Sequence, residues 1–105
     1  MGFLGGLFGG GAKKEQIIDM ISRGGIIIDV RSQAEFKGGN VPGSKNIPLN
    51  VISNRVNEIK ALKKPVVLCC ASGGRSGQAT AILKQEDIEC ENGGGWTQVN
   101  SLVTS

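Results

Sequence analysis

The residues best suited to chemistry in this sequence are two adjacent cysteines, Cys69 and Cys70, which are followed by a glycine-bearing loop. They close an apolar run that begins at Pro65, and they lead into Ala71-Ser72-Gly73-Gly74-Arg75-Ser76. A thiolate is a strong nucleophile, and the backbone N–H groups of a tight turn and the positive end of a helix dipole favour thiolate over thiol. We therefore predict that Cys70 is a nucleophile and that the loop after it stabilises an anion.

The sequence contains no histidine. This excludes Ser-His and Cys-His dyads and Cys/His zinc sites, so backbone dipoles or Arg and Lys side chains must activate the nucleophile. Arg75 offers a planar guanidinium for an oxyanion, and the Ser72 and Ser76 hydroxyl groups can add donors. Such chemistry requires no metal and no organic cofactor.

The residues on either side of the loop predict a buried strand and a helix that hold it. The strand is expected to start at Pro65 and end at Cys69, because Val66 to Leu68 are continuously apolar. The helix is expected from Ser76 to Lys84, where apolar residues recur on one face. Gly73 permits backbone geometry that side chains disfavour.

The rest of the chain alternates helical and strand patterns. We expect one of Gly24 and Gly25 to end the first helix in the left-handed conformation, Ser32 and Glu35 to form a capping box, and Asn50 to cap a later helix. The expected helices are 13–23, 32–37, 51–62 and 96–102, and the further strands are 26–30, 46–48 and 88–91, with a loop at 93–96. Such alternation predicts an α/β fold: a small three-layer sandwich with a central, mostly parallel sheet of four or five strands flanked by helices.

The 105 residues suffice for one small domain, which we place at 13–105. Residues 1–12 are expected to be a flexible, glycine-rich apolar tail. A weak membrane or partner contact is the alternative, through the side chains Phe3, Leu4, Leu7 and Phe8. This tail lacks the basic region and the cleavage site of a signal peptide. No run approaches the roughly 18 apolar residues that span a bilayer, so we expect no stable membrane insertion.

Charge and cysteine content narrow the partners and the compartment. The net charge of +3 is scattered over 12 basic and 9 acidic residues, which predicts no nucleic-acid partner. The third cysteine is Cys90, for which we expect a structural role. An odd number of cysteines without framework spacing argues against a secreted disulfide scaffold. We expect a cytoplasmic protein.

Four blocks of the sequence resemble the single-domain rhodaneses, which are sulfurtransferases of the thiosulfate:cyanide type. These blocks appear in the family's order over about residues 13–102. They are Ile28-Asp29-Val30-Arg31 with Glu35-Phe36, Val41-Pro42-Gly43-Ser44-Lys45-Asn46-Ile47-Pro48, the loop Cys70-Ala71-Ser72-Gly73-Gly74-Arg75-Ser76, and Gly94-Gly95-Trp96. Asn40 stands where the family often has histidine, and Trp96 follows the glycines directly.

The resemblance implies a double displacement that passes through a Cys70 persulfide. The expected partners are a small sulfur-donor anion and a cyanide or thiol acceptor, including a protein thiol. Cys70 is then the catalytic residue, Asp29 and Arg31 are supporting residues, and the substrate-binding residues are Ala71, Ser72, Gly73, Gly74, Arg75 and Ser76. The alternative is a rhodanese-like module that binds a partner or senses thiol oxidation without turnover.

Because two cysteines are adjacent, the loop can be counted from either of them, and each count resembles a different family. Counted from Cys69, the spacing to Arg75 imitates a protein tyrosine phosphatase loop, whereas from Cys70 it gives a six-residue rhodanese loop. Both patterns require a glycine three residues after the cysteine, and only Cys70 has one, Gly73. We therefore assign the nucleophile to Cys70. Cys69 should point the opposite way and be buried and inert, with a resolving thiol as the alternative.

Asp29 and Arg31 lie at the carboxyl end of a predicted strand, where ligands of open α/β sheets gather. They could line or brace the cysteine loop. We favour a structural role in which Arg31 pairs with Glu35 or with a backbone carbonyl. Trp96 is expected in the core or in a pocket wall.

Overall fold

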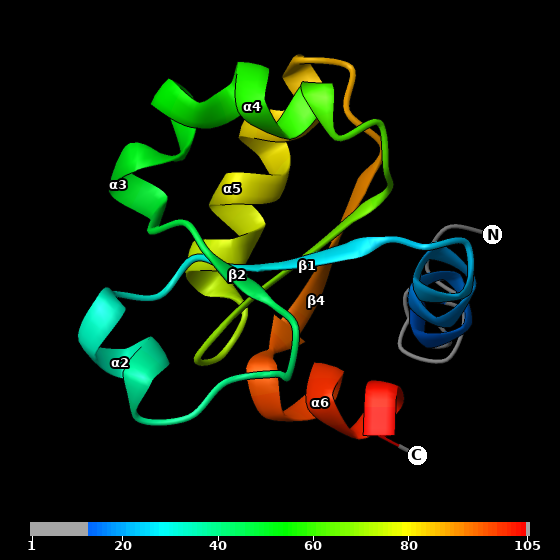
Figure 1. The fold of residues 1–105 in the computed structure, drawn as a ribbon, viewed down its shortest axis with the longest axis vertical. Coiled ribbons are helices and arrows are strands. Elements are labelled where there is room, and N and C mark those ends of the chain that lie inside the picture. The colour runs from blue at the N-terminus through cyan, green and yellow to red at the C-terminus, as the bar shows by residue number, and fades with distance from the viewer. Residues whose placement is uncertain (1–12, 105) are drawn as a thin grey trace, which may run out of the picture.

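The computed structural model describes residues 13–104, so the predictions for residues 1–12 lie outside the described residues. One parallel sheet has the strand order β2-β1-β3-β4. Its strands are β1 (Ile26–Asp29), β2 (Lys45–Asn46), β3 (Val66–Cys70) and β4 (Cys90–Gly95). Helices lie on both faces of the sheet (Figure 1). The predicted three-layer α/β fold is confirmed, with four strands.

Side chains that alternate along β3 separate two apolar cores. Leu68 and Cys70 face the core under α3 (Leu49–Ile52), α4 (Val56–Ala61) and α5 (Gly74–Gln85). Val67 and Cys69 face the core under the helix at 13–22 and α6 (Trp96–Thr104). Successive residues of a strand point to opposite faces. The prediction that Cys69 and Cys70 point in opposite directions is therefore confirmed.

Two local sequence signals act as predicted. The Ser32 hydroxyl accepts from the Glu35 N–H at 3.2 Å, and the Glu35 carboxylate accepts from the Ser32 N–H at 3.0 Å, which opens α2 (Gln33–Lys37). This reciprocal capping box satisfies two N–H groups that the first turn leaves unpaired. Gly24, after the first helix, has a φ of 85°. The capping box and the left-handed glycine are confirmed.

The helix expected at 51–62 is instead three short pieces. Leu49–Ile52 is α3, Ser53–Arg55 is a 3₁₀ turn, and Val56–Ala61 is α4. The N-cap of α3 is Pro48, and Asn50 lies inside the helix. The predicted cap by Asn50 is therefore wrong. Pro48 has an extended ψ of 147° and makes no side-chain cap hydrogen bond. Serine and asparagine side chains compete for backbone hydrogen bonds, which is consistent with the break.

The last strand differs from the prediction, because β4 runs through the glycines that were expected to form a loop. Cys90–Gly95 pairs with β3, whereas residues 88–91 were expected. A Cβ on Gly93 would lie 2.6 Å from Val99 Cγ2 and 2.9 Å from Val67 Cγ1. Gly93 therefore serves the close packing of α6 on the sheet. A strand of glycines has no alternation of side chains, so the sequence pattern did not reveal it.

None of the helices within residues 13–104 combines the length and the apolar character that crossing a membrane requires.

Candidate functional site

Cys70 is the last residue of β3, which therefore ends one residue later than the predicted end at Cys69. A three-residue loop follows, and α5 begins at Gly74, two residues before the predicted start. Cys70 is 1% exposed, while Ala71, Ser72 and Gly74 around it are exposed. The Cys70 side chain is thus buried at the end of a strand, beside a short exposed loop.

The loop and the first turn of α5 surround the Cys70 sulfur with donors. The Gly73 N–H donates to Sγ at 3.0 Å and the Ser76 N–H at 3.4 Å, and the Ser76 hydroxyl lies 3.3 Å from Sγ. Gly73 is the N-cap of α5 and has a φ of 105°, which a side chain would make costly. Since Gly73 offers no capping side chain, the Cys70 sulfur takes the place of an N-cap oxygen and accepts the N–H of Ser76, the third residue of α5.

These contacts make Cys70 the acidic thiol of the three. Burial raises the pKa of Cys70, but hydrogen bonds from the Ser76 hydroxyl and from the N–H groups of Ser76, Gly73 and Ser72 outweigh it and lower the pKa to about 7. Burial raises the pKa of Cys69 to about 12 and that of Cys90 to about 11. Near neutral pH only Cys70 among them has a large thiolate fraction.

Arg75, predicted to hold an oxyanion with its guanidinium, already has a carboxylate partner. Nη1 and Nη2 donate to the two Glu35 oxygens at 2.7 and 3.0 Å. Both side chains are about two-fifths exposed, at 38% and 39%. The Arg75 guanidinium and the cap N–H of Ser32 hold the pKa of Glu35 at about 2. An anionic substrate must therefore compete with Glu35 for Arg75.

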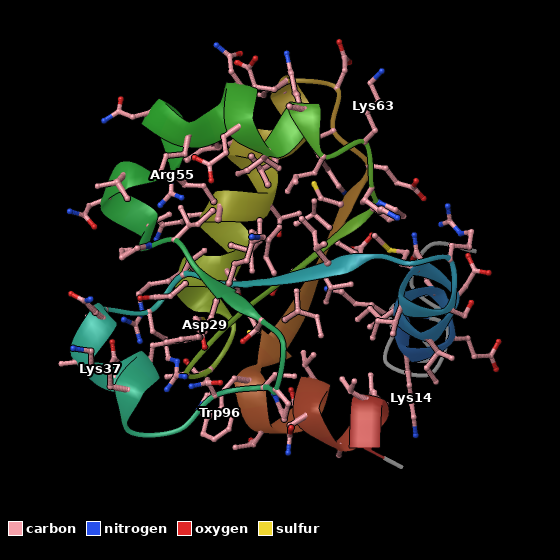
Figure 2. All side chains as sticks on the ribbon, in the orientation of Figure 1. Lys14, Asp29, Lys37, Arg55, Lys63 and Trp96 are labelled. Carbon is pink, nitrogen blue, oxygen red and sulfur yellow. The ribbon has the colours of Figure 1, made fainter. Side chains whose placement is uncertain are left out.

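Asp29 and Arg31 form a buried ion pair on the opposite side of the sheet from Cys70. Asp29 is the β1 neighbour of Cys69, and its Oδ2 lies 2.7 Å from Arg31 Nη2. Arg31 also donates to the carbonyl oxygens of Glu35 at 3.3 Å and Gly39 at 2.6 Å. Its guanidinium lies 4.9 Å from the centroid of the Trp96 ring, which sits at the start of α6 (Figure 2).

The contacts of Arg31 tie β1 to α2 and to the segment that follows it. The geometry matches the predicted pairing of Arg31 with backbone carbonyls, while its carboxylate partner is Asp29 and not Glu35. The hydrogen bond to Asp29 raises the pKa of Arg31. Neither residue makes a hydrogen bond to the Cys70 sulfur among the contacts of the described residues. Their link to the loop is indirect: Arg31 donates to the Glu35 carbonyl, and the Glu35 carboxylate pairs with Arg75.

Two residues at the site were missed from the sequence. Glu35 was predicted only as a capping residue, although its place in the first turn of α2 was correct. Asn92 on β4 contacts Ser76 and Gly73, whose groups surround the Cys70 sulfur and together form what we call the cysteine cradle. Its position before three glycines gave no periodic signal, and it was placed in no predicted strand.

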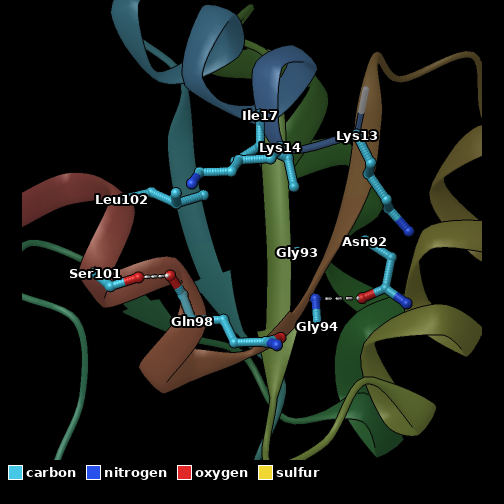
Figure 3. Close-up of a pocket in the computed structure, with 9 residues that line it drawn as sticks. All are labelled: Lys13, Lys14, Ile17, Asn92, Gly93, Gly94, Gln98, Ser101 and Leu102. Atoms are coloured by element: carbon cyan, nitrogen blue, oxygen red, sulfur yellow. Dashed lines mark hydrogen bonds between the residues drawn. The ribbon is translucent and has the colours of Figure 1, made fainter. Parts of the chain in front are cut away.

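A separate pocket of about 410 Å³ lies across β4 from the cradle, between the helix at 13–22 and α6 (Figure 3). Lysine and amide side chains contribute to its lining, and so do Asn92 and Gly94 of β4. Cys70 is not among the lining residues. The lining residues are Lys13, Lys14, Ile17, Asn92, Gly93, Gly94, Gln98, Ser101 and Leu102. Within residues 13–104, no cluster of three or more His, Cys, Asp or Glu side chains could hold a metal ion.

The chain is thus an α/β domain with a cysteine of lowered pKa at the carboxyl edge of a parallel sheet. A family model described as Rhodanese-like domain matches residues 13–102. The chain belongs to this family, as the sequence blocks predicted.

Known relatives agree with this placement. The chain is 46% identical over 59 residues to the uncharacterized protein YqhL of Bacillus subtilis, which covers 56% of the chain and 46% of YqhL. It is 38% identical over 61 residues to a sulfurtransferase of Allochromatium vinosum, covering 58% of the chain and 56% of the relative. The matches thus span about half of each relative. A solved rhodanese with anions from E. coli is 33% identical, with a TM-score of 0.65 over 70% of this chain and 89% of that one.

Proposed function

We propose that this protein is a sulfurtransferase that carries a sulfane sulfur on Cys70. Family membership and a sulfurtransferase among the relatives support the reaction class. The observation that carries the assignment to Cys70 is the cradle, in which two N–H groups and the Ser76 hydroxyl surround Sγ within 3.4 Å. The donors of the loop can also stabilise a persulfide anion, whose charge lies on the sulfur bonded to Sγ.

In the first half of the proposed reaction, the Cys70 thiolate attacks the outer sulfur of thiosulfate. The bond from Sγ to that sulfur forms, the sulfur–sulfur bond of thiosulfate breaks, and sulfite leaves with the electron pair. In the second half, cyanide or a thiolate attacks the terminal sulfur of the persulfide. The Sγ–sulfur bond breaks, and the Cys70 thiolate is regenerated. Both halves are nucleophilic displacements at sulfur that need no external oxidant.

Thiocyanate formation from thiosulfate and cyanide tests the proposal in its simplest form. We expect turnover with the wild-type protein, together with a trapped species that carries one additional sulfur atom on the Cys70 peptide. If thiosulfate, a small-molecule persulfide and polysulfide all fail to load Cys70, the sulfurtransferase assignment is wrong and the non-turnover module remains.

A thiol-oxidation sensor is less well supported than transfer, for a geometric reason. A sensor cysteine is often poised next to an accessible resolving thiol. Cys69 points to the other core, Cys90 is buried near the Thr80 carbonyl, and burial raises both pKa values well above that of Cys70.

The pH dependence of Cys70 reactivity should follow a single ionisation near pH 7. The lowered pKa means that the thiolate is the minor form below about pH 7 and the major form above it. The alkylation rate of the Cys70 peptide by iodoacetamide should therefore rise with pH and level off by about one and a half units above the midpoint. Cys69→Ala should leave the midpoint unchanged. A midpoint at the ordinary cysteine value would contradict the role of the cradle.

Glu35→Gln should improve the use of thiosulfate. The carboxamide keeps an oxygen for the Ser32 N–H, and so preserves the capping box, while it removes the charge that occupies Arg75. We expect KM for thiosulfate to fall about two- to fivefold, the range that exposed ion pairs cover, with kcat little changed.

A matched control for this variant is Glu58→Gln. Glu58 also forms an exposed two-contact ion pair, with Arg55, but it lies on α4. It changes the net charge by the same amount, so its KM for thiosulfate should stay at the wild-type value. Equal effects of both variants would mean that Arg75 does not bind the donor anion.

A further inference from the structure

Asn92 connects the edge strand β4 to both sides of the cysteine cradle. Its Oδ1 accepts from the Ser76 hydroxyl at 2.7 Å and from the Gly94 N–H at 2.9 Å. Its Nδ2 donates to the Gly73 carbonyl at 3.0 Å. Figure 3 shows the bond from Gly94, with Asn92 beside α5. A register shift in the pairing of β3 and β4, between Leu68 and Cys69, accompanies this position. Such irregularities often redirect a side chain.

The neighbours of the Asn92 amide fix its orientation. The Gly94 N–H can only donate and the Gly73 carbonyl can only accept, so the oxygen must face Gly94 and the nitrogen must face Gly73. The oxygen that faces Ser76 is then an acceptor without a proton. The Ser76 hydroxyl must therefore donate its single proton to the Asn92 oxygen.

This leaves the Ser76 oxygen, and not its proton, facing the Cys70 sulfur at 3.3 Å. In that arrangement the hydroxyl can accept the S–H of the thiol, and the Ser76 hydrogen bond that lowers the pKa of Cys70 forms only when the hydroxyl turns away from Asn92. When Cys70 ionises, its proton leaves for solvent or base, and the Ser76 hydroxyl must rotate toward sulfur to stabilise the charge. Asn92 Oδ1 then keeps only the Gly94 N–H. The amide oxygen and the sulfur compete for one proton.

We propose that Asn92 is a positioning residue that sets the balance between thiol and thiolate at Cys70 through the orientation of the Ser76 hydroxyl. The inference requires that Cys70 be the reactive thiol, but it does not depend on which sulfur donor or acceptor is used. It identifies a control point on β4, outside the contiguous Cys70–Ser76 loop.

Most of the other charged groups on the elements around Cys70 are held in ion pairs. Arg75 of α5 faces the loop and is paired with Glu35 of α2. The Cys69 thiol lies on the opposite face and has a raised pKa. The other ion pairs on these elements are Asp29 with Arg31, Arg55 with Glu58, Lys60 with Glu86, and Glu91 with Lys13 and Lys84. Lys37 of α2 and Lys45 of β2 are lysines, whose side chains offer no acceptor for a hydroxyl proton. Since none of these groups accepts the Ser76 hydroxyl proton, a change at Asn92 can be read at Cys70.

The decisive variant is Asn92→Ala, because the proposal and a simple loss of loop structure predict opposite signs. Without the amide oxygen, the Ser76 hydroxyl is free to donate to sulfur, so the alkylation midpoint of the Cys70 peptide should fall by about half to one pH unit. A loop that merely loosens would lose donors to sulfur, and the midpoint would rise. Asn92→Asp supplies a stronger, charged acceptor and should raise the midpoint by about one unit or more.

The Ser76→Ala background separates the relay from any direct effect. In that background Asn92→Ala should leave the midpoint where Ser76→Ala alone puts it, because no hydroxyl proton remains to be shared. The midpoints come from the pH profile of iodoacetamide alkylation, resolved by peptide mass spectrometry, and they require no sulfur transfer. An unchanged or raised midpoint in Asn92→Ala, or an equal shift with and without Ser76, would overturn the proposal.

Discussion

Cys70→Ser is expected to abolish persulfide formation and to lower thiocyanate production at least about 1000-fold, as removal of an enzyme nucleophile does. The serine hydroxyl has a far higher pKa than a thiol, and the cradle provides donors but no base to activate it. Mass spectrometry after incubation with thiosulfate should show one added sulfur on the wild-type Cys70 peptide and none on the variant.

The adjacent cysteine provides the matched control. Cys69→Ala removes a thiol one residue away, on the opposite face of β3, whose pKa burial raises to about 12. It should keep persulfide loading at Cys70, with only a modest loss of stability from the smaller buried side chain. Loss of loading in Cys69→Ala, measured on protein that remains folded, would show that the two thiols act together and would contradict the assignment to Cys70 alone.

Arg31→Met is expected to cause the largest loss of stability, because it leaves the Asp29 carboxylate buried without its guanidinium. Asp29 is 0% exposed and Arg31 is 5% exposed. Breaking a buried ion pair by removing one partner typically costs about 3–5 kcal/mol. The free energy of unfolding from urea titration should fall by that amount. The variant should also release the Glu35 and Gly39 carbonyls that Arg31 holds.

Three companion variants show whether the cost comes from the buried charge. Arg31→Lys keeps a charge but loses the planar geometry that reaches two carbonyls and lies over Trp96, so an intermediate loss is expected. Asp29→Asn combined with Arg31→Met should recover part of the stability, because no uncompensated charge remains. Arg55→Met breaks an exposed pair and should change stability little. Equal losses in Arg31→Met and Arg55→Met would refute this account of the buried pair.

The sequence determined the elements whose signals are local. A run of apolar residues predicted β3, and a serine and a glutamate three residues apart predicted the start of α2. The glycine pair Gly24-Gly25 predicted the end of the first helix. Each depends on contacts within a few residues along the chain, so the order of residues carries the information. The choice of Cys70 over Cys69 is also local, since the glycine spacing decides the register and strand alternation turns the two thiols apart.

Only the tertiary structure decided which groups meet at the loop. Glu35 reaches Arg75 across 40 positions in sequence, and Asn92 reaches Ser76 across 16. The sheet order, the packing of α6 on Gly93 and the register shift between β3 and β4 set these approaches. Contacts between distant segments depend on how whole elements pack, which local spacing does not encode. The sequence therefore pointed to Cys70, while the fold revealed the Glu35 carboxylate that pairs with Arg75 and the Asn92 amide that accepts from the Ser76 hydroxyl.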